Sequence, residues 1–352
     1  MVNGEGLKNK ERLKIMKYPE YCVAIRTLGT AGEKFQQLLD SLKAQEHKPK
    51  KILVYIAEGY PLPKETIGIE KYIRCAKGMV AQRSLPFDEV DTDYVLFCDD
   101  DLYLPPDLVE RMFEGLQNKK GDCIALNAFH SINLSKFQQI AVFIHSFISS
   151  RKDDGWYVRI KRNASYSYNS YPKENIIPTE SAPGACYLCK KSTYQAIHFE
   201  DEQWLDKMSY AAADDQLFHY KMHLAGFRVL LFDNSGIIHL DAQAGIRPRR
   251  KNKMFLQKKN LFIMWYRTIY EVRTSPKWRK EDNEIIRNIE KWRCIGAFTW
   301  RCLFGVLTLP LEVIHYREPQ FFVDYFRGLW AGWKYVHSEE YKAIPKFDAY
   351  IS

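Results

Sequence analysis

Residues 95–107 read VLFCDDDLYLPPD and place three consecutive carboxylates directly after an apolar run. Neighbouring like charges repel one another, and an ionised carboxylate is costly to bring close to an apolar core. A solvated acidic turn at the end of a strand would accommodate Asp99, Asp100 and Asp101, and so would a bound cation. Carboxylate oxygens are hard ligands that suit Mg²⁺ or Mn²⁺. The rest of the chain has to distinguish the two interpretations.

The segments around this stretch alternate between apolar runs and amphipathic helices. Apolar runs at 21–28, 50–59 and 92–101 predict buried strands, while helical spacing within 29–45 and a proline-initiated segment at 105–117 predict helices. This alternation indicates a mostly parallel sheet with helices on both faces, in which ligands bind at the carboxyl ends of the strands. The acidic triplet lies at such an end.

The second half of this region continues the pattern less regularly. Residues 70–90 predict a loop and a helix, 122–132 a strand, and 135–178 a helix followed by a Tyr-rich loop. A strand and a helix with a Ser/Thr N-cap are predicted within 181–197. A helix from about Asp214 that ends at Gly226, and then a strand at 227–232, complete the pattern.

The composition is that of a globular protein, with 352 residues, 46% of them hydrophobic and 14% aromatic. The eight cysteines are scattered among apolar residues, which predicts reduced core thiols in a reducing compartment. Cys186 and Cys189 form a CxxC pair without a second pair at zinc-ligand spacing, so zinc is not expected. The N-terminal residues show no secretory signal, and Arg301 interrupts the longest apolar run. We therefore expect a cytoplasmic protein, either soluble or peripheral on the inner face of the membrane.

The net charge of +9 is unevenly distributed. Residues 246–352 contain 21 Lys and Arg against 11 Asp and Glu, and six of the eight Trp residues. This asymmetry predicts a boundary near residue 246, which separates an N-terminal extension at 1–18 and a domain at 19–245 from a basic, aromatic-rich helical region at 246–352.

Two further segments of the sequence contain ionisable residues that could belong to a functional site. Asp214 and Asp215 open a predicted helix, where an N-terminal carboxylate is stabilised whether or not it has another role. His239 follows a later apolar segment, and a lone histidine is more often structural than a ligand.

The order and spacing of these features resemble a family-two glycosyltransferase with the GT-A fold. Residues 21–59 resemble the family's opening strand, helix and second strand. AKGMVAQRSLPFDEVDTDYVLFCDDDLYLPPD (76–107) is similar to its G…R/N…DxD region, PGACYLCKKSTYQAI (183–197) to the strand and turn under the acceptor site, and DDQLFHYKMHLAGFRV (214–229) to its ED…aG segment. One departure is that the second strand ends in Ala57-Glu58 where the family usually has an acidic pair.

The resemblance implies a role for each matching residue. Asp99 and Asp101 match the two acidic positions of the DxD motif, which bind a divalent cation, Mn²⁺ or Mg²⁺, and the donor, with Asp100 between them. His239 matches a late histidine that completes the metal shell, and Asp215 matches the general base. The other nucleotide-contact positions correspond to Thr27, Glu58, Lys77 and Arg83.

This reading predicts a metal-dependent inverting glycosyltransferase, hexosyl- or deoxyhexosyl-transferring, of the bacterial polysaccharide type. Its donor would be a UDP-, dTDP- or GDP-sugar and its acceptor a glycan or lipid-linked hydroxyl. The alternatives are a nucleotidyltransferase, which also uses paired Asp residues and a metal, and a non-catalytic assembly protein that binds sugar nucleotide or glycan.

The basic C-terminal region leaves two interpretations open. Phe322, Phe326, Leu329 and Trp333 fall on one face of a predicted helix, which either packs on the catalytic domain or lies in the membrane interface. Nucleic acid is not an expected partner, because no RNA-binding signature accompanies the charge.

Overall fold

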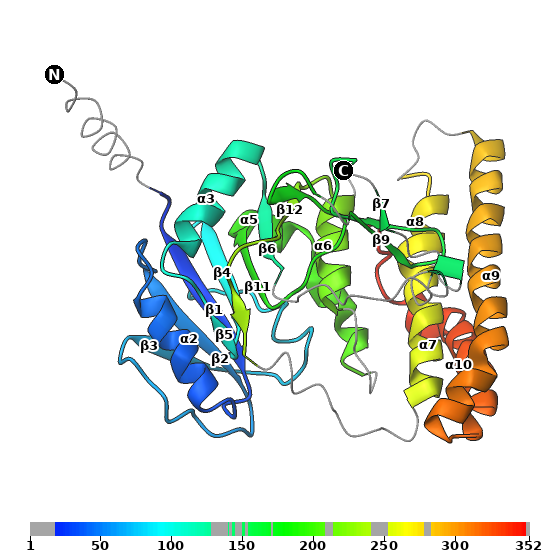
Figure 1. The fold of residues 1–352 in the computed structure, drawn as a ribbon, viewed down its shortest axis with the longest axis horizontal. Coiled ribbons are helices and arrows are strands. Elements are labelled where there is room, and N and C mark those ends of the chain that lie inside the picture. The colour runs from blue at the N-terminus through cyan, green and yellow to red at the C-terminus, as the bar shows by residue number, and fades with distance from the viewer. Residues whose placement is uncertain are drawn as a thin grey trace.

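The computed structural model (Figure 1) contains an eight-stranded mixed sheet with strand order β10-β12-β6-β11-β4-β1-β2-β3. It describes residues 18–127, 140, 143–144, 150–151, 154–169, 172–207, 214–240, 253–277 and 283–349. The predicted helix from Ser135 lies largely outside the described residues.

The predominantly buried strands that follow apolar runs of the sequence include β1 (Tyr21–Thr27), β2 (Lys51–Ala57), β4 (Tyr94–Asp99), β6 (Cys123–Leu126) and β12 (Val229–Phe232). β3 (Glu70–Cys75), β10 (Ile176–Pro178) and β11 (Cys186–Lys190) complete the sheet. β3, β2, β1 and β4 are parallel, as are β6 and β12, whereas β11 and β10 pair antiparallel with their neighbours. The predicted mostly parallel sheet is confirmed.

Helices cover both faces of this sheet, because alternate residues of each strand point to opposite sides. Tyr21, Val23 and Ile25 of β1 pack in one core with α2 (Glu33–Lys43) and α3 (Leu108–Lys119). Cys22 and Ala24 of the same strand belong to the opposite core, with α5 (Lys191–Ala196) and α6 (Asp214–Leu224).

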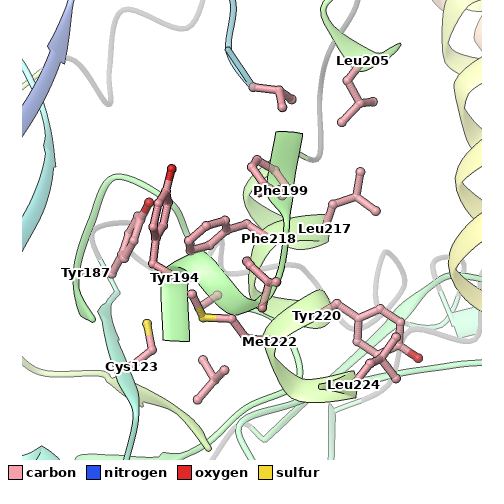
Figure 2. Packing of buried hydrophobic residues seen from close by; sticks show 14 of the residues in the cluster. Cys123, Tyr187, Tyr194, Phe199, Leu205, Leu217, Phe218, Tyr220, Met222 and Leu224 are labelled. Carbon is pink, nitrogen blue, oxygen red and sulfur yellow. The ribbon is translucent and has the colours of Figure 1, made fainter. Parts of the chain in front are cut away.

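Phe218 of α6 lies at the centre of the second core (Figure 2). Its ring centroid is 5.1 Å from that of Tyr187, 6.1 Å from Tyr194 and 5.0 Å from Phe199. These rings come from β11, α5 and the 3₁₀ helix Phe199–Leu205, so one side chain ties α6 to three other segments.

Three local predictions are wrong. The predicted Tyr-rich loop contains the strands Val158–Ile160, Tyr166–Asn169 and Ile176–Pro178. Residues 70–75 form the edge strand β3 rather than a loop and helix, and their polar pattern reflects partial exposure at the edge of the sheet. The N-cap of α5 is Lys190 and not a Ser or Thr, because β11 runs directly into the helix. The backbone N–H of Lys191 donates instead to the carbonyl of Asp93, at 2.8 Å.

Two small sheets accompany the main one. β5 (Leu102–Tyr103) pairs antiparallel with β13 (Ile238–His239). β7 (Ser150–Arg151), β9 (Tyr166–Asn169) and β8 (Val158–Ile160) form a three-stranded sheet beside α6 and the C-terminal helices. The first of these sheets brings the end of β4 next to His239.

The C-terminal region is helical, as predicted. It consists of α7 (Lys253–Trp265), a π-helical turn (Tyr266–Tyr270), α8 (Glu271–Thr274), α9 (Glu284–Tyr316), α10 (Gln320–Val336) and α11 (Glu339–Lys342). α10 approaches α7 closely at Gly328 and Gly332. A Cβ atom added to Gly328 would lie 2.5 Å from the carbonyl oxygen of Phe255, so a larger residue would force the helices apart.

These helices share the core of the sheet domain. Trp265 of α7 stacks on Phe298 of α9, with ring centroids 4.1 Å apart, and both belong to the core that contains α6. Arg267 donates from Nε and Nη2 to the buried carboxylate of Glu202, at 2.8 and 2.7 Å. A paired, hydrogen-bonded charge of this kind is the form in which ions are tolerated inside a protein.

Of the described helices, α9 is the one long and apolar enough to cross a membrane, judged by length and composition alone. Core helices of soluble proteins can satisfy the same criterion, but only 22% of the most apolar part of α9 is buried.

We predict that Phe218→Ala lowers the free energy of unfolding by about 3–5 kcal/mol, because it leaves a cavity among three aromatic rings. Urea unfolding followed by tryptophan fluorescence measures this change. Phe326→Ala, at a side chain that is more than half exposed, is the control and should change stability by no more than about 0.5 kcal/mol. Equal losses from the two substitutions would contradict the central position of Phe218.

Candidate active site

The three carboxylates at the end of β4 have three different partners. β4 ends at Asp99, so the backbone bends at Asp100 and Asp101 and the simple alternation of an extended strand stops there. The three side chains therefore meet two elements: Asp99 and Asp100 meet neighbouring residues of β1, and Asp101 meets β13.

Asp99 pairs with Arg26 of the neighbouring strand. Arg26 and Asp99 are opposite one another in the β1–β4 register, and Arg26 Nη2 donates to Asp99 Oδ1. The same nitrogen donates to the carbonyl oxygen of Gly184, at 3.2 Å. Arg26 is a site residue that the sequence analysis missed, and only the strand register could have revealed it.

Asp100 accepts a hydrogen bond from Thr27 Oγ1, which itself accepts one from the backbone N–H of Gly29 at 2.8 Å. Burial raises the pKa of Asp100 to about 6, and the charges of Asp101 and Asp99 add to this, although the bond from Thr27 acts in the opposite direction. The repulsion expected from the sequence is therefore present at this residue.

Asp101 lies next to His239. The antiparallel pairing of β5 with β13 places the two residues together, and the backbone N–H of Leu240 donates to the carbonyl oxygen of Asp101 at 2.8 Å. Asp101 Oδ1 is 3.7 Å from His239 Nε2. Two residues separated by 138 positions in the sequence thus meet at the carboxyl edge of the sheet.

A divalent cation fits this pair better than it fits the full predicted set. Among the residues that the structure describes, no three His, Cys, Asp or Glu side chains stand close enough to form a metal site by themselves. A Mg²⁺ site often has only one or two protein carboxylates and takes its other ligands from phosphate and water. Asp101 and His239 fit such a reduced set, whereas the Asp99 carboxylate is already bound to Arg26.

Asp214 and Asp215 begin α6 and have different surroundings. Asp214 is buried, and its Oδ2 lies 2.9 Å from Nε of the equally buried Arg83. Asp215 is only partly buried and accepts two backbone hydrogen bonds, from Gly184 N to Oδ2 at 3.1 Å and from Gln216 N to Oδ1 at 3.0 Å. The first carboxylate is buried in an ion pair, whereas the second is oriented by two amides and remains partly exposed.

Gly184 connects the two acidic groups. Its carbonyl accepts from Arg26, which binds Asp99, and its N–H donates to Asp215. A Cβ atom at this position would lie 2.2 Å from Arg83 Nη1 and 2.6 Å from Asp215 Cβ, so only glycine fits. The acidic triplet and Asp215 therefore line one site with a common support.

Two buried side chains, the charged Arg83 and the neutral His219, keep α6 in place. Burial alone would lower the pKa of Arg83, but the Asp214 carboxylate beside it raises that pKa instead. His219 places Nδ1 2.9 Å from the carbonyl oxygen of Asp215. Burial, with the charge of Arg83, lowers the pKa of His219 to about 3, so its imidazole is neutral at physiological pH.

The predicted nucleotide-contact positions are only partly gathered at this edge. Thr27 lies at the site, and Arg83 lies behind it, paired with Asp214. Glu58 is exposed just after β2, and its backbone N–H donates to Cys75 O at 2.9 Å. Lys77 is also exposed, with Nζ 4.8 Å from the ring centroid of Tyr60.

The central part of the chain matches a known protein family. Residues 61–174 match the family model described as glycosyl transferase family 2. This range includes the acidic triplet, Lys77 and Arg83. It leaves out Thr27, Glu58, Asp215 and His239. No curated protein matches the chain.

Solved structures similar to this chain include that of GalNAc-T7 with UDP, GalNAc and Mn²⁺. The sequence identity is 11% and the TM-score 0.46, and the alignment covers 78% of this chain and 54% of that one. The chain thus spans about half the length of that structure. Over residues 61–174 the chain is thus similar to glycosyl transferase family 2, and its mostly parallel sheet with helices on both faces is of the GT-A type.

Proposed function

We propose that this protein is a metal-dependent, inverting glycosyltransferase that moves a sugar from a nucleoside-diphosphate sugar to a hydroxyl of a glycan or lipid-linked acceptor. The family match supports glycosyl transfer. The observation that carries the finer proposal is the support that Gly184 gives to both Asp215 and the Arg26–Asp99 pair. That arrangement supports a proposal in which Asp215 accepts a proton and the nearby acidic cluster binds a cation with the diphosphate.

Asp215 has the geometry expected of the general base. Two amides orient its carboxylate, and no cationic side chain pairs with it within the described ranges. As the acceptor oxygen bonds to the anomeric carbon, Asp215 takes its proton, while the bond from that carbon to the diphosphate breaks. Attack from the face opposite the leaving group inverts the anomeric centre.

The end of β4 has the chemistry expected of the leaving-group site. Asp101 and His239 would hold the divalent cation, which supplies a Lewis acid for the departing diphosphate. Thr27 orients Asp100 towards the same edge, and Arg26 adds a fixed positive charge next to Asp99. We place the donor's diphosphate at this edge.

The donor can be identified by slow hydrolysis without an acceptor. We expect UDP-, GDP- or dTDP-sugars incubated with protein and Mn²⁺ or Mg²⁺ to release nucleotide from one donor class, and a chelator to abolish that release. Turnover of a sugar 1-phosphate with a nucleoside triphosphate would point instead to a nucleotidyltransferase. The absence of a response to every donor from folded protein would contradict the proposal.

Asp215→Asn should lower the rate of sugar transfer by about 10²–10⁴-fold, because the amide cannot accept the proton. Metal-dependent binding of the nucleotide, measured by calorimetry, should be unchanged, since the donor site is intact. Asp107→Asn, at an exposed residue before α3, is the matched control and should retain full transfer activity. Unchanged transfer by the Asp215 variant would indicate a non-catalytic binding protein.

Asp100 should make the metal-free protein less stable as the pH rises. The folded state keeps its proton up to about pH 6, whereas the unfolded chain releases it near 3.8, so stability falls between about pH 4 and pH 6. The loss is roughly 3 kcal/mol at about 1.4 kcal/mol per pKa unit.

Urea unfolding of the wild type and of Asp100→Asn at pH 4 and pH 7.5 isolates this contribution. The variant should gain stability relative to the wild type at the higher pH only. Adding Mn²⁺ with nucleotide should reduce the gain, because a cation favours the ionised carboxylate. Parallel pH profiles without metal would contradict the assignment.

We also propose a peripheral contact with an anionic membrane through α9 and α10. Phe322, Phe326 and Trp333 remain 41–53% exposed, and Leu307 of α9 is 71% exposed, so these side chains are not covered by the sheet domain. The surrounding region has the chain's basic excess, which complements anionic lipid. Of the two interpretations open from the sequence, exposure favours the membrane interface, on the cytoplasmic side.

The double substitution Phe326→Ser with Trp330→Ser should weaken binding to phosphatidylglycerol vesicles by at least about tenfold, because two exposed aromatic rings no longer leave water. Vesicle co-sedimentation measures the binding. Ile69→Ser, which removes an equally exposed apolar side chain near β3, is the control and should bind as the wild type does. Equal binding by all three proteins would exclude this surface.

A further inference from the structure

A cavity of about 200 Å³ lies between the sheet domain and the C-terminal helices. Its wall combines Tyr166 of β9, Gln216 and Tyr220 of α6, Asn260 of α7 and Arg301 of α9. Figure 1 shows α6 between the sheet and α7, with α9 on the outer side. The cavity therefore exists only because the C-terminal helices pack against the catalytic domain.

The lining of the cavity is amphipathic. Ile160, Leu217, Leu261 and Met264 supply apolar surface, and the guanidinium of Arg301 supplies positive charge. Pockets that bind small molecules combine an apolar wall with a few polar groups in this way.

Arg301 is a cation without an anionic partner in the part of the chain that the structure describes. Its Nη1 donates to the carbonyl oxygen of Asn163 at 2.8 Å, while Nε is buried with no hydrogen-bond acceptor there. Burial lowers its pKa, and the groups that act against this are Tyr166, Cys302 and Tyr325, none of them a carboxylate. A buried charge without a counter-ion is costly, and a bound anion would offset that cost.

A second cation lies close to Arg301. Burial lowers the pKa of Lys258 on α7, the charge of Arg301 lowers it further, and Glu312 acts in the opposite direction. Lys258 Nζ is 4.5 Å from the ring centroid of Tyr325, which also lies near Arg301. Lys258 thus adds positive charge near Arg301, and Glu312 offsets part of it.

One residue of the cavity wall, Gln216, is the chain neighbour of the proposed general base. Gln216 follows Asp215 in α6, and its Oε1 accepts a hydrogen bond from the hydroxyl of Tyr166. The pKa of Tyr166 is raised chiefly by burial, and it is also raised by the charge of Asp215 and lowered by that of Arg301. The phenol of Tyr166 therefore lies within electrostatic reach of both the base and the cation.

We propose that this cavity is the acceptor site, and that Arg301 binds an anionic group on an acceptor whose adjoining part is apolar. This inference rests on the proposed function, because it takes Asp215 as the base that faces the acceptor hydroxyl. An amphipathic phosphate satisfies both requirements: the phosphate neutralises Arg301, and the apolar part covers Leu261 and Met264. This proposal gives the C-terminal helices a role in selecting the acceptor.

Isothermal titration calorimetry of the full chain with decyl phosphate, below its critical micelle concentration, tests this proposal. Decyl phosphate should bind more tightly than inorganic phosphate or decanol, because only it has both parts. Arg301→Gln should weaken the binding at least tenfold, and the matched control Arg327→Gln, at an exposed arginine of α10, should leave it unchanged. Unchanged binding by the Arg301 variant, or equal binding of inorganic phosphate, would overturn the proposal.

A second measurement needs no substitution in the cavity. Decyl phosphate with a photoreactive diazirine at the end of its alkyl chain should label peptides from 158–166, 214–224 or 257–268 of the wild type. Labelling confined to other peptides would overturn the proposal even if the Arg301 variant failed to fold.

The acceptor site and the proposed function can fail separately. Arg301→Gln should keep the metal-dependent release of nucleotide from the donor, which needs no acceptor. If the donor is hydrolysed normally but decyl phosphate binds equally well to the wild type and to Arg301→Gln, the proposed acceptor site is wrong and the proposed function stands. If binding of decyl phosphate depends on Arg301 but the wild type hydrolyses no donor, the proposed transferase function is wrong and the cavity remains a binding site.

Discussion

The candidate site depends on one constraint: the negative charge of three adjacent carboxylates at the end of β4 has to be offset by neighbouring side chains. Each acidic residue is matched by a different neighbour: Arg26 beside Asp99, Thr27 beside Asp100 and His239 beside Asp101. These neighbours come from two segments that are adjacent to the end of β4 only in the folded sheet. The fold thus holds negative charge together at one edge, and that charge is what a divalent cation would require.

The neighbouring side chains do not offset all of this negative charge, and the remaining repulsion is relevant to cation binding. The raised pKa of Asp100 shows that burial and neighbouring charges still disfavour one ionised carboxylate. A site that binds a cation only together with its substrate would retain such residual repulsion in the absence of ligand. Gly184 extends the same edge to Asp215, so Asp215 and the Arg26–Asp99 pair are held by one backbone segment.

Much of the fold could be predicted from the sequence because buried parallel strands are continuous apolar runs. β1, β2 and β4 have this property, whereas β3 is an edge strand with a mixed EKYIRC sequence that does not identify it. Periodicity describes what a segment buries, and an edge strand buries little.

The candidate site could be predicted only as a set of residue types. The acidic triplet and His239 are visible in the sequence, and the structure brings Asp101 and His239 together. Arg26 was missed, because its role follows from its register with Asp99 and not from any motif. Gly184 was quoted within a motif, but its function as a shared support depends on a tertiary contact.

The interpretation of Arg301 differs between the sequence and the structure. In the sequence it is a charge that interrupts an apolar run and argues against a membrane span. In the structure it points from a largely exposed helix towards the catalytic domain and lines a cavity with Tyr166 and Gln216. A helix with one apolar face towards lipid and one cation towards the active site would connect the two surfaces. On the proposals made above, the C-terminal region would hold the acceptor at the membrane and the sheet domain would hold the donor.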